Sequence, residues 1–182
     1  MRITPLKLKD AAILEPVVHG DHRGFFMESY NEAVLKDLGI NFNFIQDNQS
    51  LSSEPGVLRG LHYQLAPKAQ TKLIRVLSGA IYDVILDIRR NSPTFGQWIG
   101  VILSEFNNRQ LLVPKGFAHG FCTLTPNTQV LYKVDEYYSP DHDRGILWND
   151  TALQIDWPVS EPKLSDKDRH HPLLADAEMN FD

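Results

Sequence analysis

The chain has 182 residues and a mass of 20.7 kDa, which suffices for one domain with a sizeable core and is too short for two ordinary ones. Hydrophobic residues make up 42% of it and charged residues 23%, as in folded globular proteins. The 18 Lys and Arg residues are outnumbered by 23 Asp and Glu residues, which gives a formal net charge of -5 at pH 7. Because nucleic-acid-binding surfaces need a basic surplus, we expect no nucleic-acid partner. From the length, we predict a single domain over residues 1–182.

The sequence also bears on cellular location and cross-linking. No apolar run approaches the roughly 18 residues of a transmembrane helix, and the first ten residues are charged where a signal peptide would be apolar. We therefore expect a cytoplasmic protein with no membrane partner. The single cysteine, Cys122, excludes an intrachain disulfide and a zinc site built from several thiolates.

Short runs rich in Val, Ile, Leu, Phe and Tyr follow one another along the chain, separated by 11 prolines and 11 glycines. This punctuation is typical of β-strands. Only residues 31–39 read as a helix in the first half, with Gly39 as its C-cap, and the polar tail from Ser160 is expected to add one or two short helices. In chain order, the predicted strands cover residues 23–29, 42–50, 57–64, 71–77, 79–90, 98–104, 109–114, 120–124 and 129–138.

The clearest strand, residues 79–90, alternates two sets of side chains. One face carries Ala80, Tyr82, Val84, Leu86 and Ile88, and the other carries Ile81, Asp83, Ile85 and Asp87. The strand follows residues 71–77 across Ser78 and Gly79, so these two runs read as a hairpin. A string of strands without alternating helices indicates a sandwich or barrel of antiparallel sheet.

Motifs narrow the chemistry further. The chain has no dinucleotide-binding glycine motif, no phosphate-binding Walker loop and no G-x-S-x-G nucleophile elbow, which disfavours nucleotide-cofactor redox and kinase chemistry. Residues 114–119, PKGFAH, resemble the second motif of the cupin superfamily. That resemblance implies a mainly β fold, a cupin-type antiparallel jelly-roll barrel with a few short peripheral helices.

The metal ligands of that superfamily are incomplete here. Metal-binding cupins carry H-x-H in their first motif, whereas this chain has His62-Tyr63-Gln64. Lys72 stands about where the acidic ligand is expected, and a cation there would repel a bound metal. We therefore expect neither a metal nor another cofactor.

Longer stretches carry a more specific resemblance. They include GDHRGFFMESYN, QDNQS, VLRGLHYQ, TKLIRVLSGAIYDVILDIRRNSPTFGQW, NRQLLVPKGFAHGF, LYKVDEYYSP, GILWND, IDWP and LSDKD. In this order, from Gly20 to Leu174, they resemble the dTDP-4-dehydrorhamnose 3,5-epimerase family. The resemblance implies inversion of C3 and C5 of dTDP-4-dehydro-6-deoxy-D-glucose to give dTDP-4-dehydro-L-rhamnose, in dTDP-L-rhamnose biosynthesis, by a homodimer.

The implied catalytic residues make chemical sense. Both carbons flank the C4 ketone, so deprotonation gives an enolate and needs a base, an acid and an oxyanion partner, with no redox cofactor. By resemblance, His62 is the base, Asp168 orients its ring, Tyr132 reprotonates C5 from the opposite face and Lys72 neutralises the enolate oxygen. A neutral imidazole, with a pKa near 6.5, accepts protons at cytoplasmic pH.

Without the resemblance, the sequence supports a catalytic role for Lys72 more strongly than for Tyr132. Tyr132 alternates with Val130 and Val134 and would read as a core aromatic. Lys72 shares its predicted strand face with Ile74 and Val76, and burying an ammonium among apolar side chains costs free energy. The position of Lys72 therefore indicates a functional role even without the resemblance.

Substrate contacts are also implied by the resemblance. Arg23 and Arg59 match the diphosphate contacts, and an arginine fork fits paired phosphate oxygens. Asp143 stands where the family pattern has a longer glutamate, and the resemblance assigns no role to His170-His171. For His119, a structural role is about as well supported as a functional one. The remaining nucleotide and sugar contacts are Glu28, Gln46, Asp47, Asn48, Lys72, His119, Asp143 and Lys167, with Phe26 and Tyr138 as candidates for stacking on thymine.

Two alternatives remain open. A related enzyme of the same fold could invert only C3 or only C5, or isomerise the ketone, in another deoxysugar pathway. A non-catalytic cupin could merely bind a nucleotide sugar, although intact His62, Lys72, Tyr132 and Asp168 speak against it.

Strand geometry raises one further expectation. Arg59 and His62 are three residues apart, so a regular strand would point them to opposite faces, although the resemblance places both at one substrate. A bulge at Gly60 would return them to one face. Alternatively, Arg59 reaches the diphosphate around the barrel mouth or in the partner subunit's site.

The incomplete metal-ligand set yields a prediction. Turnover should survive exhaustive chelation, because the H-x-H pair is broken and Lys72 brings positive charge to that position. The measurement is the epimerisation rate before and after EDTA treatment and desalting. A loss that is reversed by a divalent metal would contradict the prediction.

Overall fold

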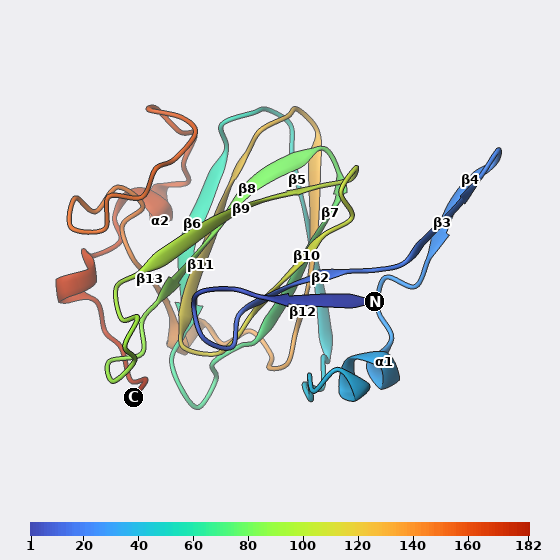
Figure 1. The fold of residues 1–182 in the computed structure, drawn as a ribbon. Helices are drawn as coiled ribbons and strands as arrows, with labels where there is room; N and C mark the ends of the chain where they lie inside the picture. Colours follow the sequence, from blue (N-terminus) through green and yellow to red (C-terminus); the bar gives the residue numbers. More distant parts are fainter.

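The computed structural model describes residues 1–182 as two antiparallel sheets packed face to face, with a separate two-stranded hairpin (Figure 1). The larger sheet has the order β1 (Arg2–Pro5), β2 (Ala12–Glu15), β10 (Gln110–Val113), β7 (Lys72–Ser78), β12 (Thr128–Val134) and β5 (Gln46–Ser52). The smaller sheet has the order β13 (Asp143–Gly145), β6 (Leu58–Gln64), β11 (Phe117–Thr123), β8 (Ala80–Asp87) and β9 (Trp98–Ser104). The hairpin consists of β3 (Val18–Asp21) and β4 (Gly24–Met27). The mainly β, jelly-roll-type fold expected from the sequence is confirmed.

The helices are short and peripheral. The α-helices are α1 (Glu32–Asp37) and α2 (Asp166–Arg169), and single 3-10 turns occur at Pro140–His142 and Leu174–Asp176. Asn31 caps α1 by accepting a hydrogen bond from the Val34 N–H, and Gly39 follows the helix with a φ of +82°. No helix of the structure has the length and apolar character needed to span a membrane.

Hydrophobic side chains fill three layers, and the central one lies between the two sheets. It combines Ile74 and Val76 of β7 with Ile81 and Ile85 of β8 and Phe121 of β11. The outer face of the smaller sheet is covered by residues of the C-terminal segment, including Leu153 and Phe181. The outer face of the larger sheet is covered by α1 through Leu35. Strand β8 contributes apolar side chains to both of its faces, because the larger sheet covers one face and the C-terminal segment covers the other.

The hairpin predicted across Ser78 and Gly79 is wrong. Strand β7 pairs with β10 and β12, whereas β8 pairs with β9 and β11 in the other sheet. The turn therefore carries the chain from one sheet to the other, with Gly79 at a φ of +81°. Tight turns look alike in sequence whether the strands that they join pair with each other or separate.

Four strands were missed, and several were predicted to extend beyond their observed ends. β1, β2, β3 and β13 have only three or four residues each, too few to show an alternating pattern. Residues 42–45 and 135–138, predicted as strand, lie outside β5 and β12.

Strand β6 contains the irregularity that the positions of Arg59 and His62 require. His62 pairs with His119 and Arg59 pairs with Phe121, so two residues of β6 oppose one residue of β11 between these pairs. Gly60 adopts a φ of +128° within the bulge. A Cβ atom on Gly60 would lie 2.5 Å from the Cα atom of Gly120, so the two backbones approach too closely for any side chain. The bulge expected at Gly60 is confirmed.

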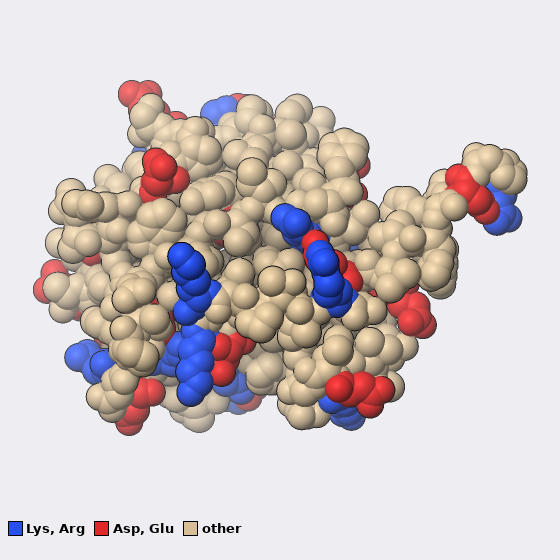
Figure 2. Space-filling view, viewed as in Figure 1, with Lys and Arg blue, Asp and Glu red and all other residues tan.

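The hairpin β3–β4, called the arm below, projects away from the two sheets (Figure 1). Figure 2 shows it as an isolated protrusion with an acidic and a basic side chain near its end, where Asp21 pairs with Arg23. Phe25 and Phe26 are 62% and 67% exposed. Large aromatic side chains so exposed on one projecting element indicate a surface that another element covers.

We predict that Gly60→Ala destabilises the protein by at least about 2 kcal/mol, because it combines a left-handed φ with a backbone clash. Gly24→Ala is the matched control, since Gly24 has a φ of +130° but no atom within 4 Å of its Cβ position. Urea unfolding at a fixed protein concentration measures both variants. Equal losses would mean that the close approach of Gly60 to Gly120 does not matter.

Candidate active site

A cavity of about 290 Å³ lies among both sheets and the α2 segment. Its walls are mainly polar, in contrast to the apolar layer that continues beside it. Ser50, Arg59, His62, Lys72, His119, Phe121, Tyr132, Ser165, Lys167 and Asp168 line it. The four residues expected to be catalytic are therefore in one cavity, as is Arg59, which the bulge turns toward the side of His62.

His62 and Asp168 form a close pair, with 2.5 Å between His62 Nε2 and Asp168 Oδ1. Ser165, the N-cap of α2, donates from its hydroxyl to Asp168 Oδ2 and accepts from the Asp168 N–H. Burial would raise the pKa of Asp168, but polar contacts from His171, His62 and Ser165 outweigh it and hold that pKa well below its usual range. Asp168 is therefore a carboxylate at neutral pH.

The His62 ring is neutral at neutral pH for a related reason. Burial lowers its pKa, and the nearby Asp168 carboxylate offsets only part of this effect. A neutral ring facing a carboxylate keeps its proton on Nε2, the nitrogen that contacts Asp168. Nδ1 then carries the free lone pair, so His62 can act as a base.

Lys72 is a buried cation without a close counterion. Its residue is only 9% exposed, and its ammonium makes no salt bridge within the chain. Burial lowers the pKa of Lys72 to about 8, although the charges of Asp143 and Asp83 partly oppose the shift. An ammonium in this position can stabilise a negative charge that develops in the cavity.

Tyr132 lies on β12 beside the central hydrophobic layer. Burial raises the pKa of its phenol, and the positive charge of Arg59 offsets part of this shift. Its hydroxyl therefore stays protonated and can donate a proton.

The remaining cavity contacts include a second histidine–carboxylate pair. His119 Nε2 lies 2.5 Å from Asp83 Oδ1, and the other carboxylate oxygen of Asp83 has no hydrogen-bond partner. At the rim, Lys167 pairs with Asp143, which also accepts a hydrogen bond from the Tyr138 hydroxyl at 3.1 Å. Sequence reasoning assigned no role to Asp83, although a carboxylate between Ile81 and Ile85 on an apolar strand face was a signal.

Strand β5 divides its predicted contacts between two faces. Gln46 and Asn48 are joined by a hydrogen bond of 2.8 Å and share their strand face with Ser50, which lines the cavity. Asp47 points to the opposite face, where it pairs with Lys133. The structure therefore does not bring the Asp47 side chain to the cavity.

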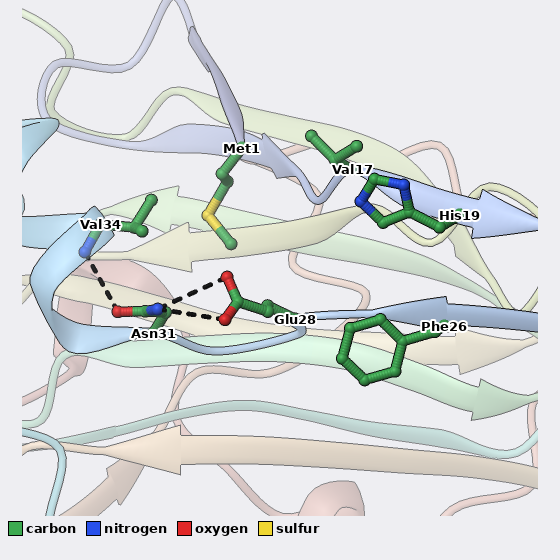
Figure 3. A pocket seen from close by; sticks show the side chains of 7 residues that line it. All are labelled: Met1, Val17, His19, Phe26, Glu28, Asn31 and Val34. Carbon is green, nitrogen blue, oxygen red and sulfur yellow. Dashed lines mark hydrogen bonds between the residues drawn. The ribbon is translucent and has the colours of Figure 1, made fainter.

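Three further predicted contacts lie on the arm or directly after it, and none of them lines the cavity of His62 within this chain. Arg23 pairs with the neighbouring Asp21. Phe26 and Glu28 line a different pocket of about 420 Å³ between the arm and the start of α1, where the Asn31 amide contacts Glu28 (Figure 3). The predicted substrate contacts thus fall into two groups, one in the barrel and one on the arm.

The fold and the cavity define a jelly-roll barrel whose interior brings together a histidine–carboxylate pair, a buried ammonium and a phenol. The family model described as dTDP-4-dehydrorhamnose 3,5-epimerase matches residues 5–176. The chain belongs to the dTDP-4-dehydrorhamnose 3,5-epimerase family.

Individual relatives agree with this assignment. The chain is 51% identical to the dTDP-4-dehydrorhamnose 3,5-epimerase of Shigella flexneri over 179 residues, 98% of each chain. It shares 64% identity with the enzyme from Bacillus anthracis, solved with TDP and pyrophosphate bound, with a TM-score of 0.93 and coverage of 94% of this chain and 98% of that one. It shares 47% identity with a Legionella pneumophila 3,5-epimerase in complex with dTDP-4-keto-L-rhamnose, with a TM-score of 0.91 and coverage of 96% and 93%.

A more distant relative is named as an enzyme that inverts a single carbon. The 3'-monoepimerase of Streptomyces bikiniensis, solved with dTDP-quinovose, is 35% identical, with a TM-score of 0.88 and coverage of 94% of this chain and 87% of that one. The fold alone therefore does not decide how many carbons are inverted.

We predict that the Lys72 ammonium loses its proton near pH 8, because burial lowers its pKa to about that value. NMR titration of protein labelled with ¹³C at the lysine side chains measures this, and Lys72→Met identifies the signal by removing it. A Lys72 signal that titrates with exposed lysines, at about pH 10.4, would contradict the prediction.

Proposed function

We propose that this protein inverts C3 and C5 of dTDP-4-dehydro-6-deoxy-D-glucose to give dTDP-4-dehydro-L-rhamnose, in dTDP-L-rhamnose biosynthesis. The observation that carries the proposal is the grouping of the His62–Asp168 pair, Lys72 and Tyr132 around one cavity in a member of this family. The single domain over residues 1–182 and the cytoplasmic location expected from the sequence are part of the same proposal.

His62 is the base in this mechanism. Its Nδ1 removes the proton from C3 or C5, and the electron pair of the C–H bond moves to the C4 oxygen as an enolate. The imidazolium that forms is stabilised by the Asp168 carboxylate at Nε2, 2.5 Å away. One base serves both carbons because both are adjacent to the same ketone.

Lys72 and Tyr132 complete the step. The Lys72 ammonium has no carboxylate partner to compete for it, so it is free to neutralise the enolate oxygen. Tyr132 donates its phenolic proton to C5 from the face opposite His62, which inverts that carbon. Because burial holds the pKa of Tyr132 above its usual value, the proton stays on the phenol until the carbanion forms.

Binding of the nucleotide in this proposal uses polar and basic side chains at the cavity and on the arm. Arg59, His119 and Lys167 line the cavity, and we assign them contacts with the diphosphate and sugar. Asn48, Gln46, Asp143 and Tyr138 would add polar and stacking contacts at its edge, and Asp47 would contribute through its backbone.

The protein acts as a homodimer in this proposal, with each arm completing the partner's site. The arm projects away from the two sheets (Figures 1 and 2). Arg23 and Phe26 of the arm, and Glu28 directly after it, do not line the cavity of their own chain, and Phe25 and Phe26 are exposed. A two-fold symmetric pair of arms would bury these aromatics and bring a cation and a ring to the partner's cavity.

The alternative of a single-centre epimerase retains support from the Streptomyces bikiniensis relative. It predicts proton exchange at one carbon only. The identity of 64% to a 3,5-epimerase, against 35% to the monoepimerase, favours inversion at both carbons.

We predict that His62→Ala lowers the rate of proton exchange at both carbons by at least about 10³-fold, because one base serves both. Tyr132→Phe should retain deprotonation while inversion at C5 largely fails. Incubation with the dTDP-keto sugar in deuterium oxide, followed by NMR, reports C3 and C5 separately. Normal formation of the doubly inverted product by Tyr132→Phe would remove Tyr132 from the mechanism, and exchange at a single carbon in the wild type would establish the alternative.

We predict that mixed dimers of His62→Ala and an arm double variant, Arg23→Ala with Phe26→Ala, recover activity. Half of randomly mixed dimers are heterodimers, and each has one site with an intact barrel and an intact arm, so the expected rate is about a quarter of the wild-type rate. The control mixes His62→Ala with Tyr132→Phe, which leaves every barrel defective. Recovery in the control, or none in the test mixture, would refute arm exchange.

A further inference from the structure

His171 is a buried histidine beside the proposed base that the mechanism leaves unused. It lies just after α2, its side chain is 9% exposed, and its Nε2 atom is enclosed without a hydrogen-bond partner. That nitrogen is 3.5 Å from Asp168 Oδ1, the same oxygen that His62 contacts at 2.5 Å. The His62 and His171 rings meet edge to face with their centroids 5.4 Å apart.

The backbone opposite His171 leaves room for this ring. A Cβ atom at Gly145 would lie 2.4 Å from the imidazole, so only glycine there allows the ring its present position. Gly145 pairs directly with His62 between β13 and β6. Local packing thus holds an unpartnered nitrogen against the His62–Asp168 pair.

Three potential ligand atoms converge at this point. His62, Asp168 and His171 each offer one ligand atom, and the three atoms lie within 4.8 Å of one another. The Nε2 atoms of both histidines face Asp168 Oδ1. Ligands of a tetrahedral zinc ion with bonds of about 2.0–2.1 Å are roughly 3.3 Å apart. The two separations involving Asp168, 2.5 Å and 3.5 Å, bracket that value, so small side-chain adjustments would admit an ion.

We propose that His62, Asp168 and His171 form a site for a first-row divalent transition metal that switches the proposed base off. Two imidazole nitrogens and one carboxylate oxygen are a donor set that zinc and its neighbours prefer, and calcium and magnesium do not. The ion enters through the cavity, which His62 and Asp168 both line, and solvent fills its open positions.

This site differs from the metal position of the cupin barrel. Gln64, which replaces the second histidine of the H-x-H pair, is committed elsewhere: its amide nitrogen donates to the Lys68 carbonyl and its amide oxygen accepts from the Ser139 N–H. The proposed site uses His171 and Asp168 from the C-terminal segment instead.

Inhibition follows from the tautomer of His62. A metal on Nε2 displaces the proton of that nitrogen to solvent, and Nδ1 then takes a proton from solvent to keep the ring neutral. No lone pair remains to accept the substrate proton. This consequence rests on the proposed function, whereas metal binding itself does not. The Lys72 charge opposes a second cation in the cavity, so we expect binding that EDTA reverses.

The test compares His171→Gln with His170→Gln. His170 is the adjacent exposed histidine, and it is not one of the three proposed ligands, so its replacement removes an imidazole but no ligand. Its Nδ1 contacts the Asp166 carbonyl of α2, and the glutamine side chain keeps a hydrogen-bond donor there. We expect Zn²⁺ to inhibit the wild type and His170→Gln alike, and the inhibition constant to rise at least about tenfold in His171→Gln. Each inhibition curve is normalised to the same variant's rate in EDTA, and circular dichroism verifies folding.

Two measurements report the site without reference to activity. Wild type and His170→Gln should gain a visible Co²⁺ absorption band at one equivalent, and His171→Gln should not. Crystals of the wild type soaked in ZnCl₂ should show an anomalous peak bonded to the three named atoms. Equal zinc inhibition of both variants, or zinc density only elsewhere, would overturn the proposal. Metal binding without inhibition would instead refute the role of His62 as base.

Discussion

The rest of the site depends on one constraint, the desolvation cost of charged side chains that are buried between the two sheets. Lys72 and Asp83 belong to opposite sheets, and both are buried beside the central hydrophobic layer. A buried ion is costly unless it is paired, and the structure treats the two differently. Asp83 is paired with His119, whereas Lys72 is left without a close carboxylate. The unpaired ammonium is the group that a developing negative charge can use.

The same constraint explains the arrangement around His62. Burial favours the neutral ring, and Asp168 fixes which nitrogen carries its proton. Ser165 secures Asp168 in turn, because it caps α2 and contacts the carboxylate with one hydroxyl. A short helix of four residues thus serves mainly to position one carboxylate against a strand of the smaller sheet.

Strand geometry determines which side chains share the cavity. In a regular strand, Arg59 and His62 would face opposite sides, and the extra residue at Gly60 brings them to the same side. The bulge is possible because Gly60 and Gly120 on neighbouring strands both lack a side chain. The arm projects from the two sheets (Figure 1), and its arginine and aromatic rings do not line the cavity of their own chain.

The sequence by itself determined the class of fold and singled out Lys72. Alternating apolar residues identify strands, and a lysine on the strand face of Ile74 and Val76 indicates a functional position. These two features are local, because each depends on neighbours along the chain. The other catalytic residues, and the expectation of a bulge between Arg59 and His62, came from the resemblance to a known family. Only the tertiary structure decided that β7 and β8 belong to different sheets, that Asp47 faces away from the cavity and that the arm leaves the barrel. It also placed His171 against Asp168, and Asp83 against His119. Strand partners and contacts between distant segments depend on packing across the whole chain, which no short stretch of sequence encodes.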